Sequence, residues 1–258
     1  MLARKLRYAA KSGKRIKPQG KRRNERGKNM SMRMRRKRNF DERMLACDDL
    51  LLARGTAGIL NMKEAAENYR DLIDFSAVFG NDHPVELEIG CGKGGFIIEM
   101  ANARENVNFL ALEKMSNVIL TPMERVAQEQ IKNVKFLNIR AECLPCYIPE
   151  NSIDAIYLNF STPLPKIGYA SQRLTHRNFL EKYKKLLKKG GKIIQKTDDR
   201  PFFDFSLEEY AAAGYKLEKA DYDLHKNGNP EGNIETEYEK KWVECGKPIH
   251  LAIAVKDE

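Results

Sequence analysis

The chain of 258 residues is 42% hydrophobic and 32% charged, carries five Cys, and has a formal net charge of +10. Its length predicts one domain, or one domain with appendages, with enough residues to bury a sizeable core. It holds no run of 18 apolar residues and no basic start followed by a short apolar stretch. We therefore expect neither a membrane-spanning helix nor a secretory signal. Five Cys are too few for a disulfide scaffold, which predicts a cytoplasmic protein with reduced thiols.

The positive charge is concentrated near the N-terminus. Residues 1–40 hold 17 Lys and Arg against a single acid, Glu25, whereas the remaining residues hold 29 Lys and Arg against 35 Asp and Glu. A basic block of this kind is usually disordered and commonly contacts nucleic acid. We expect residues 1–38 to form a basic arm and residues 39–258 to form the folded domain. A solubilising tail, or a start codon assigned too far upstream, would produce the same charge pattern.

The first elements predicted along the chain are irregular. Residues 39–80 resemble a partly helical lead-in, with the strongest helical pattern over 64–75. From Pro84 onward, apolar runs of strand length alternate with helical patterns, which predicts βαβ units and a doubly wound, mostly parallel sheet. The predicted strands span 85–89, 107–112, 134–139, 153–158 and 193–195, and the predicted helices span 96–102, 116–130 and 178–188.

The last third of the chain continues this alternation. Residues 186–191 read Leu-Leu-Lys-Lys-Gly-Gly, which predicts a helix C-terminus with Lys near the negative end of the dipole and Gly to turn the chain. Beyond Asp198 the pattern predicts a helix over 202–213, a strand over 215–221, a loop over 227–232, a helix over 237–244 and a last strand over 249–255.

A glycine turn follows the first strand of this alternating region. Gly90, Gly92 and Gly94 lie between a predicted strand and a predicted helix, where glycine lets the backbone approach a ligand and the helix N-terminus favours electron-rich groups. With Gly95, the same letters also fit the dinucleotide pattern G-x-G-x-x-G. Glu113 closes the next strand, and a carboxylate there can accept two hydrogen bonds from a ribose diol. This arrangement suits NAD and S-adenosylmethionine equally well.

Glu88 distinguishes between these two cofactors. It lies inside the apolar strand that precedes the glycine turn, where an unpaired carboxylate would cost several kcal/mol. We therefore expect it to face the ligand or to meet a cation. The ammonium group of a methionyl moiety is such a cation, whereas the pyrophosphate of NAD would be repelled. Glu88 therefore favours S-adenosylmethionine.

Polar residues also follow the later strands. The segment from Asn159 to Lys166 comes directly after a predicted strand, and its two prolines would present Lys166 in a fixed direction. Asp198 follows the next strand in the same way. Because ligands bind at the carboxyl ends of strands in open α/β sheets, these groups are predicted to converge on one crevice. Ordinary surface charges are the alternative interpretation of Lys166 and Arg173.

Taken together, these motifs resemble those of the bacterial tRNA (guanine-N7)-methyltransferases, the TrmB family, from about Met32 to Val255. The shared motifs are Met32-Arg-Met-Arg-Arg-Lys37, Leu87-Glu-Ile-Gly-Cys-Gly-Lys-Gly94, Leu112-Glu113, Asn159-Phe160, Pro163-x-Pro-Lys166, Arg173-Leu-Thr-His176, Lys196-Thr-Asp198 and Thr236-Glu-Tyr-Glu239. The resemblance implies a Rossmann-like methyltransferase sheet with an antiparallel last strand. It also implies S-adenosylmethionine as methyl donor and N7 of a tRNA guanine as acceptor.

The resemblance and the residue patterns together give two predicted sets of site residues. The predicted cofactor-binding residues are Glu88, Gly90, Gly92, Gly94, Glu113, Arg140 and Asn159. The predicted substrate-binding residues, matched to family substrate positions, are Lys166, Asp198, Thr236, Glu237, Tyr238 and Glu239.

Three positions depart from the family pattern. Thr162 and Leu164 stand where the family usually has Asp and Trp, and Arg140 stands where it favours an Asp near the adenine. The catalytic residue therefore stays unassigned. Because guanine N7 carries a lone pair and no proton, methyl transfer needs in-line positioning more than a general base. A carboxylate at Asp198 or in the stretch 236–239 could ease the positive charge that builds on the purine.

Two other functions stay open at this point. A catalytically impaired RNA-binding relative is favoured by Thr162 and by the basic arm. A nucleotide-dependent oxidoreductase is disfavoured by Glu88. No metal site is expected, because Cys143-x-x-Cys146 lacks the second pair that structural zinc requires. Tyr238 and Trp242 are interpreted as packing residues of the last helix rather than as platforms for a base.

Overall fold

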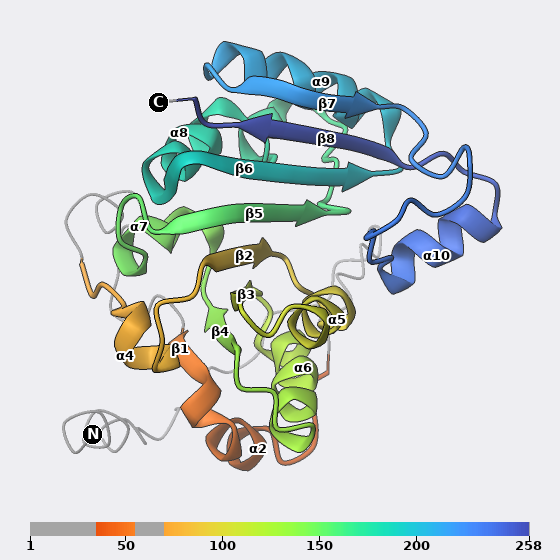
Figure 1. Ribbon diagram of the computed structural model, residues 1–258. Helices are drawn as coiled ribbons and strands as arrows, with labels where there is room; N and C mark the ends of the chain where they lie inside the picture. The colour runs from red at the N-terminus through yellow and green to blue at the C-terminus, as the bar shows by residue number, and fades with distance from the viewer. Residues whose placement is uncertain (1–34, 55–69, 258) are drawn as a thin grey trace, which may run out of the picture. The chain divides into compact units, whose positions relative to one another are not determined.

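The structure, a computed structural model, describes residues 35–54 and 70–257. Most of the predicted basic arm, and residues 64–69 of the first predicted helix, lie outside the described residues. At the centre is an eight-stranded sheet (Figure 1) with the strand order β1-β4-β3-β2-β5-β6-β8-β7. The strands are β1 (Leu51–Arg54), β2 (Val85–Ile89), β3 (Asn108–Leu112), β4 (Val134–Asn138), β5 (Ile153–Asn159), β6 (Leu187–Thr197), β7 (Lys216–Asp221) and β8 (His250–Val255).

The sheet is mostly parallel, as predicted. Each neighbouring pair from β1 to β6 runs parallel, and β8 runs antiparallel to both β6 and β7. The antiparallel strand is the last one in the chain, so the predicted methyltransferase-like sheet is confirmed. The parallel strands place their carboxyl ends at a common edge, which is called the ligand edge below.

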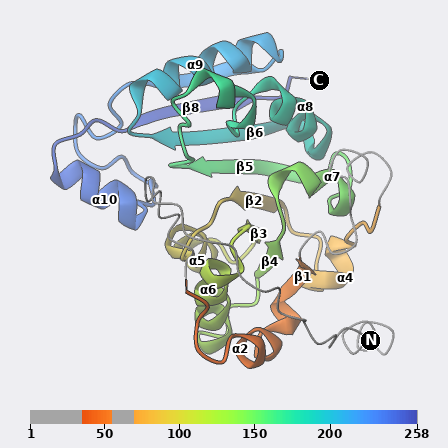
Figure 2. The same cartoon turned by 180° about the vertical axis from the view of Figure 1, so that it is seen from behind.

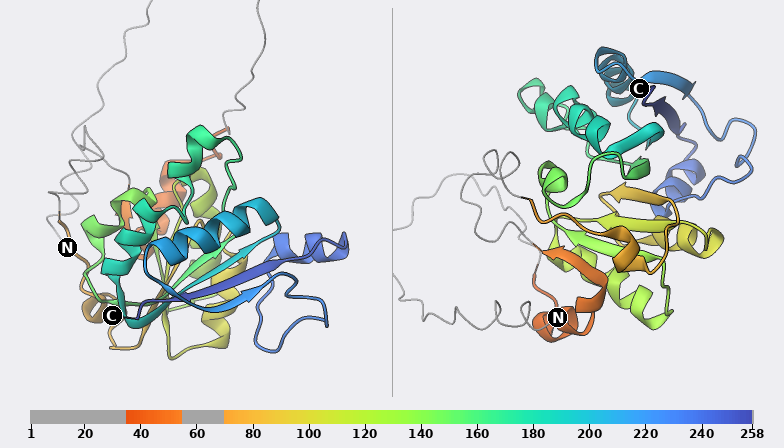
Figure 3. Two further views of the ribbon diagram at one scale, coloured as in Figure 1. Left: turned by 90° about the horizontal axis from the view of Figure 1, so that it is seen from above. Right: turned by 60° about the vertical axis from the view of Figure 1, so that its left-hand side comes forward.

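Helices connect the strands. They are α2 (Phe40–Ala46), α4 (Phe75–Phe79), α5 (Gly95–Ala103), α6 (Ser116–Gln128), α7 (Leu144–Tyr147), α8 (Arg177–Leu186), α9 (Arg200–Ala212) and α10 (Glu237–Glu244), with 3-10 turns η1 (Asp48–Leu50), η2 (Ala141–Cys143) and η3 (Ile167–Gln172). Figures 2 and 3 show α10 beyond the ends of the central strands.

Two apolar layers cover the sheet because strand residues alternate between its faces. Phe109 of β3 belongs to a buried cluster that includes residues of α2, α5 and α6, whereas Leu110 belongs to one that includes residues of α7, α8 and α9. Cys143 and Cys146 are fully buried in the second of these layers and are free thiols. Burial raises the pKa of the Cys143 thiol to about 11. The Cys-x-x-Cys pair therefore belongs to the hydrophobic core.

The beginning of β6 corrects the prediction for residues 186–191. Helix α8 ends at Leu186, and Leu187 already pairs with Ile153 of β5. Lys188 therefore lies in a strand, where its ammonium binds Asp154, rather than at a helix C-terminus. Gly190 supplies a left-handed bend within this strand, at φ +73°.

The lead-in also differs from the prediction. Residues 70–74 are not helical, because the backbone N–H groups of Asp71 and Ile73 donate to carbonyl oxygens at Cys146 and Tyr147. Helix α4 begins only at Phe75, where the Asp74 carboxylate accepts a hydrogen bond from the Ala77 N–H. Strand β1, which extends the sheet beside β4, was not predicted.

Candidate active site

Six of the predicted site residues line a cavity of about 400 Å³ at the ligand edge. It lies between the carboxyl ends of β2 and β5, the start of α5, and α10. The predicted residues that line it are Glu88, Gly90, Asn159, Thr236, Glu237 and Tyr238. Two stretches that are far apart in the sequence, the glycine turn and residues 236–238, thus line one cavity.

The three predicted glycines have different roles. All three have positive φ, +87° at Gly90, +55° at Gly92 and +79° at Gly94. A Cβ added at Gly90 or Gly92 would meet no atom within 4 Å, so their backbone faces open space. A Cβ added at Gly94 would lie 2.3 Å from Cβ of Pro122 in α6. Gly94 therefore permits close helix packing, whereas Gly90 and Gly92 leave backbone open to a ligand.

Glu88 is buried at the wall of the cavity with only part of its hydrogen-bonding capacity used. Asn159 donates from Nδ2 to Oε1 of Glu88 at 3.1 Å, while Oε2 is buried without a partner among the described residues. Burial raises the pKa of this carboxyl to about 7, although the amide of Asn159 and the charge of Lys196 oppose the shift. A buried, unsatisfied carboxylate oxygen beside a cavity is suited to a cationic ligand.

Glu113 and Arg140 follow the neighbouring strands β3 and β4 at the same edge. The Glu113 carboxylate accepts from the Met115 N–H at 2.8 Å, and its backbone carbonyl accepts from Nδ2 of Asn138 at 2.7 Å. Arg140 is exposed and donates to Glu142 at 2.7 Å. Neither residue lines the cavity itself, but both lie along the edge that leads to it.

A buried ionic network fixes α10 against the sheet. Lys196 of β6 donates from Nζ to Glu239 at 2.9 Å and to the carbonyl of Ile234 at 3.0 Å. Glu239 is fully buried and also contacts His225 at 2.9 Å and Asn233 at 3.0 Å. Burial lowers the pKa of Lys196. Burial opposes ionisation of Glu239, but its bonds with Lys196 and its other donors still bring its pKa below the usual value.

The stretch 236–239 is therefore divided between two roles. Thr236 and Glu239 form a capping box, in which the Thr236 hydroxyl accepts from the Glu239 N–H and the Glu239 carboxylate accepts from the Thr236 N–H. Glu239 faces the interior, so it holds α10 in place. Glu237 and Tyr238 lie on the cavity side of the same helix turn.

An aromatic row extends from the cavity along α10. The rings of Phe160 and Tyr238 lie 4.9 Å apart, and those of Tyr238 and Trp242 lie 5.5 Å apart. Nζ of Lys247 lies 3.5 Å from the centre of the Trp242 ring and 3.6 Å from the Asp198 carboxylate. The sequence interpretation of Tyr238 and Trp242 as packing residues agrees with these ring contacts, although Tyr238 is 44% exposed and also lines the cavity.

Sequence reasoning missed several residues at this site. Lys93, Phe96, Phe160 and Lys241 line the cavity, and Lys247 contacts Asp198. Lys93 lies inside the glycine turn, so its position in that motif could have indicated it. Lys241 and Lys247 could not be found by motif, because only the docking of α10 brings them to the ligand edge.

Thr162 and Lys166 lie on an exposed loop after β5 and do not line the cavity. This loop contains two residues with positive φ, Phe160 at +50° and Leu164 at +47°. The guanidinium of Arg173 donates to the Leu164 carbonyl from Nε at 3.3 Å and from Nη2 at 3.1 Å.

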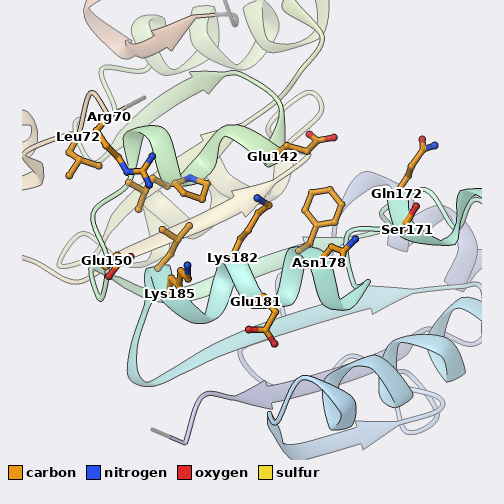
Figure 4. Close-up of a pocket in the computed structure, with 14 residues that line it drawn as sticks. Arg70, Leu72, Glu142, Glu150, Ser171, Gln172, Asn178, Glu181, Lys182 and Lys185 are labelled. Carbon is orange, nitrogen blue, oxygen red and sulfur yellow. The ribbon is translucent and has the colours of Figure 1, made fainter. Parts of the chain in front are cut away.

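A larger cavity, of about 980 Å³, lies elsewhere, along α8 (Figure 4). Lys182 projects into it from α8, and Arg70 and Glu142 also contribute to its wall. None of the predicted site residues lines this cavity. Size alone therefore does not identify the candidate site, and the convergence of polar groups at the ligand edge favours the smaller cavity.

Within 35–54 and 70–257, no group of three or more His, Cys, Asp and Glu side chains could hold a metal ion. In the same ranges, no helix is both long enough and apolar enough to cross a membrane.

Comparison with known proteins gives a family model and relatives that match most of the chain. A family model described as "Putative methyltransferase" matches residues 82–252. A Bacillus subtilis protein named tRNA (guanine-N(7)-)-methyltransferase is 42% identical over 178 residues, which cover 69% of this chain and 83% of that protein. A Lachnoclostridium phytofermentans protein of the same name is 41% identical over 181 residues, covering 70% and 85%.

Solved structures show the same fold at low sequence identity. The 16S rRNA methyltransferase KamB has a TM-score of 0.54 and 16% identity, and the match covers 73% of this chain and 94% of that chain. An antibiotic-related methyltransferase has a TM-score of 0.53 and 17% identity, covering 76% and 94%.

Proposed function

The chain belongs to the tRNA (guanine-N7)-methyltransferase family, and from this membership we propose that it transfers the methyl group of S-adenosylmethionine to N7 of a guanine in tRNA. The carboxyl group of Glu88 is the structural feature that supports this proposal most. It presents an unsatisfied oxygen at the wall of a cavity that the family motifs form together. A cofactor with an ammonium group satisfies that oxygen, whereas an anionic one does not.

The residues present at the ligand edge fit S-adenosylmethionine. Glu88 and Asn159 would hold its ammonium group, and the open backbone at Gly90 and Gly92 would follow its methionyl part. Glu113 would accept the ribose hydroxyls, as a carboxylate at the end of the second βαβ strand does. When bound, the cofactor supplies a methyl group on a positively charged sulfur, which is open to attack by a nucleophile.

The chemistry of guanine N7 requires the protein mainly to position the base. The N7 lone pair forms the new N–CH3 bond while the sulfur–carbon bond breaks, so the positive charge passes from sulfur to the purine. No proton leaves N7, and the chain therefore needs no general base at this atom. Its residues must hold the base in line and stabilise the charge. Glu237 and Tyr238 at the cavity wall fit these two requirements.

The cations around the cavity suit a tRNA backbone. Lys93, Lys166 and Lys241 are exposed at or beside the ligand edge, where they would contact phosphates. The basic residues 1–38 would add affinity that does not depend on sequence. A tRNA substrate is consistent with the cytoplasmic location expected from the five Cys. The division into a basic arm over 1–38 and a catalytic domain over 39–258 is part of this proposal.

Thr162 favours a second candidate, a tRNA-binding relative with impaired catalysis, because the family usually has Asp there. Incubating unmodified tRNA with the protein and S-adenosylmethionine, then measuring 7-methylguanosine, separates the two. We expect the modified base to form with the wild type and to fall strongly with Glu88→Gln. Binding of tRNA without any 7-methylguanosine would replace the enzyme proposal with the second candidate.

A further inference from the structure

The loop after β5 adopts a backbone conformation that its own residues disfavour. Phe160 and Leu164 both have φ near +50°, although neither is glycine or asparagine. The left-handed region is disfavoured about tenfold or more for such residues. A Leu side chain cannot hydrogen-bond to its own backbone to offset this. The conformation must therefore be held by contacts from outside the loop.

Arg173 supplies such a contact. Its Nε and Nη2 atoms donate two hydrogen bonds to the carbonyl oxygen of Leu164, at 3.3 and 3.1 Å. The bonds reach one of the two residues of this loop that have positive φ. Because the acceptor is a backbone carbonyl, this contact fixes the path of the chain two residues before Lys166.

The guanidinium of Arg173 is itself held in place. It lies 4.3 Å from the centre of the Phe205 ring of α9, in stacking distance. Two residues on, the fully buried hydroxyl of Thr175 bonds to the hydroxyl of Ser206 at 2.8 Å, also in α9. Arg173 thus links the exposed loop after β5 to helix α9.

We propose that Arg173 is a positioning residue: by holding the Leu164 carbonyl, it keeps the loop from Phe160 to Lys166 in a left-handed bend that presents Thr162 and Lys166 at the ligand edge. The consequence for methyl transfer rests on the proposed function, but the effect on the loop does not. Arg173 acts here through its planar fork and its stacking, and its charge alone is not sufficient.

Trypsin cleavage after the exposed Lys166 measures the loop without reference to activity. We expect Arg173→Met to raise the cleavage rate at Lys166 about tenfold, the factor by which the bend is disfavoured on its own. Arg173→Lys should raise it nearly as much, since lysine keeps the charge but not the fork. Arg177→Met, which removes a charge from the same segment but breaks a bond to Glu209, should leave it at the wild-type rate. Equal cleavage of wild type and Arg173→Met would overturn the proposal.

A double-mutant comparison tests whether the left-handed residue is the reason for the effect. Asparagine tolerates positive φ, so Leu164→Asn should lower the intrinsic cost of the bend. In that background, adding Arg173→Met should raise cleavage about threefold or less. If Arg173→Met has the same tenfold effect in both backgrounds, Arg173 does not act by holding Leu164.

Single-turnover methylation of tRNA then gives the functional consequence. We expect Arg173→Met and Arg173→Lys to lower the rate about tenfold, with the affinity for S-adenosylmethionine within twofold of wild type. Full activity in Arg173→Lys would show a charge contact with tRNA and would contradict the positioning role. An inert wild type would refute the proposed function, while the cleavage result would still decide the role of Arg173.

Discussion

The two oxygens of the Glu88 carboxyl have different surroundings, and this difference gives a testable pH dependence. Oε1 accepts from Asn159, whereas Oε2 is buried without a partner among the described residues. Burial raises the pKa of Glu88 to about 7, so this carboxyl changes its ionisation near neutral pH. A cationic cofactor binds the ionised form, so its affinity should rise as the pH increases through this range and binding should release a proton.

Calorimetry with S-adenosylmethionine checks this expectation. Between about pH 6 and about pH 8 we expect the affinity to rise about tenfold, following the ionised fraction of Glu88. The variant Glu88→Gln should bind more weakly and lose this dependence. A flat profile in the wild type would mean that Glu88 does not meet the ammonium group.

Thr162 provides a second test at the scale of single residues. It lies on an exposed loop outside the cavity, and no proton must leave N7. General acid–base groups contribute about 10²–10⁴-fold where a proton moves. We therefore expect Thr162→Asp to change the single-turnover rate only modestly, and Asp198→Ala and Lys166→Ala each to cost more. An inert wild type that Thr162→Asp activates would show that a carboxylate is required there.

A buried ion pair between Lys196 and Glu239 joins helix α10 to β6. Lys196→Met would leave Glu239 buried without its cation, which typically costs about 3–5 kcal/mol. We expect urea unfolding at neutral pH to show a loss of this size. Lys196→Met combined with Glu239→Gln should be less destabilised, because no uncompensated charge stays in the interior. Similar losses in the single and the double variant would mean that charge burial is not the cause.

The pH dependence of this pair follows from the lowered pKa of Glu239. A carboxyl whose pKa is lower in the folded than in the unfolded protein stabilises the fold fully above the unfolded value, about 4.3. That contribution is lost as the pH falls through the lower pKa of the folded state. The wild type should therefore lose stability on acidification over this range more steeply than Glu239→Gln.

Elements that the local amino-acid pattern marks could be predicted from the sequence. Those that form only because a neighbouring strand pairs with them could not. Strand β2 and helix α10 match their predicted bounds, since alternating apolar residues mark the first and the Thr236–Glu239 capping box marks the second. The start of β6 reads Leu-Lys-Lys-Gly-Gly and has no strand pattern. It is a strand because β5 lies beside it and because Lys256 donates to the Leu187 carbonyl.

The same distinction applies to the candidate site. Glu88 could be selected from sequence because a carboxylate in an apolar strand is conspicuous. The inward orientation of Glu239 and the bond from Arg173 to Leu164 depend on how α10 and α9 pack. The motifs alone did not indicate either contact, and the assignment of Glu239 to the substrate stays a prediction.

At the scale of the whole molecule, charge is divided between a basic N-terminal segment and a mildly acidic remainder. Such a division lets the two parts contribute differently to tRNA binding. Phosphate contacts by Lys and Arg release counterions, so the logarithm of the binding constant falls with the logarithm of salt concentration in proportion to the contacts made. Under the proposed function, the cavity at the ligand edge would determine which atom is methylated.

Deleting residues 1–29 separates these contributions, since it removes 12 Lys and Arg and one Glu but leaves every residue of the cavity. We expect the shortened protein to bind tRNA more weakly and with a shallower salt dependence. It should still modify the same guanine, because base selection resides in the domain. Titrations of both proteins with tRNA over a range of salt concentrations, followed by mapping of 7-methylguanosine, measure the two effects. An unchanged salt slope would show that residues 1–29 do not contact RNA, and a different modified base would show that they take part in selection.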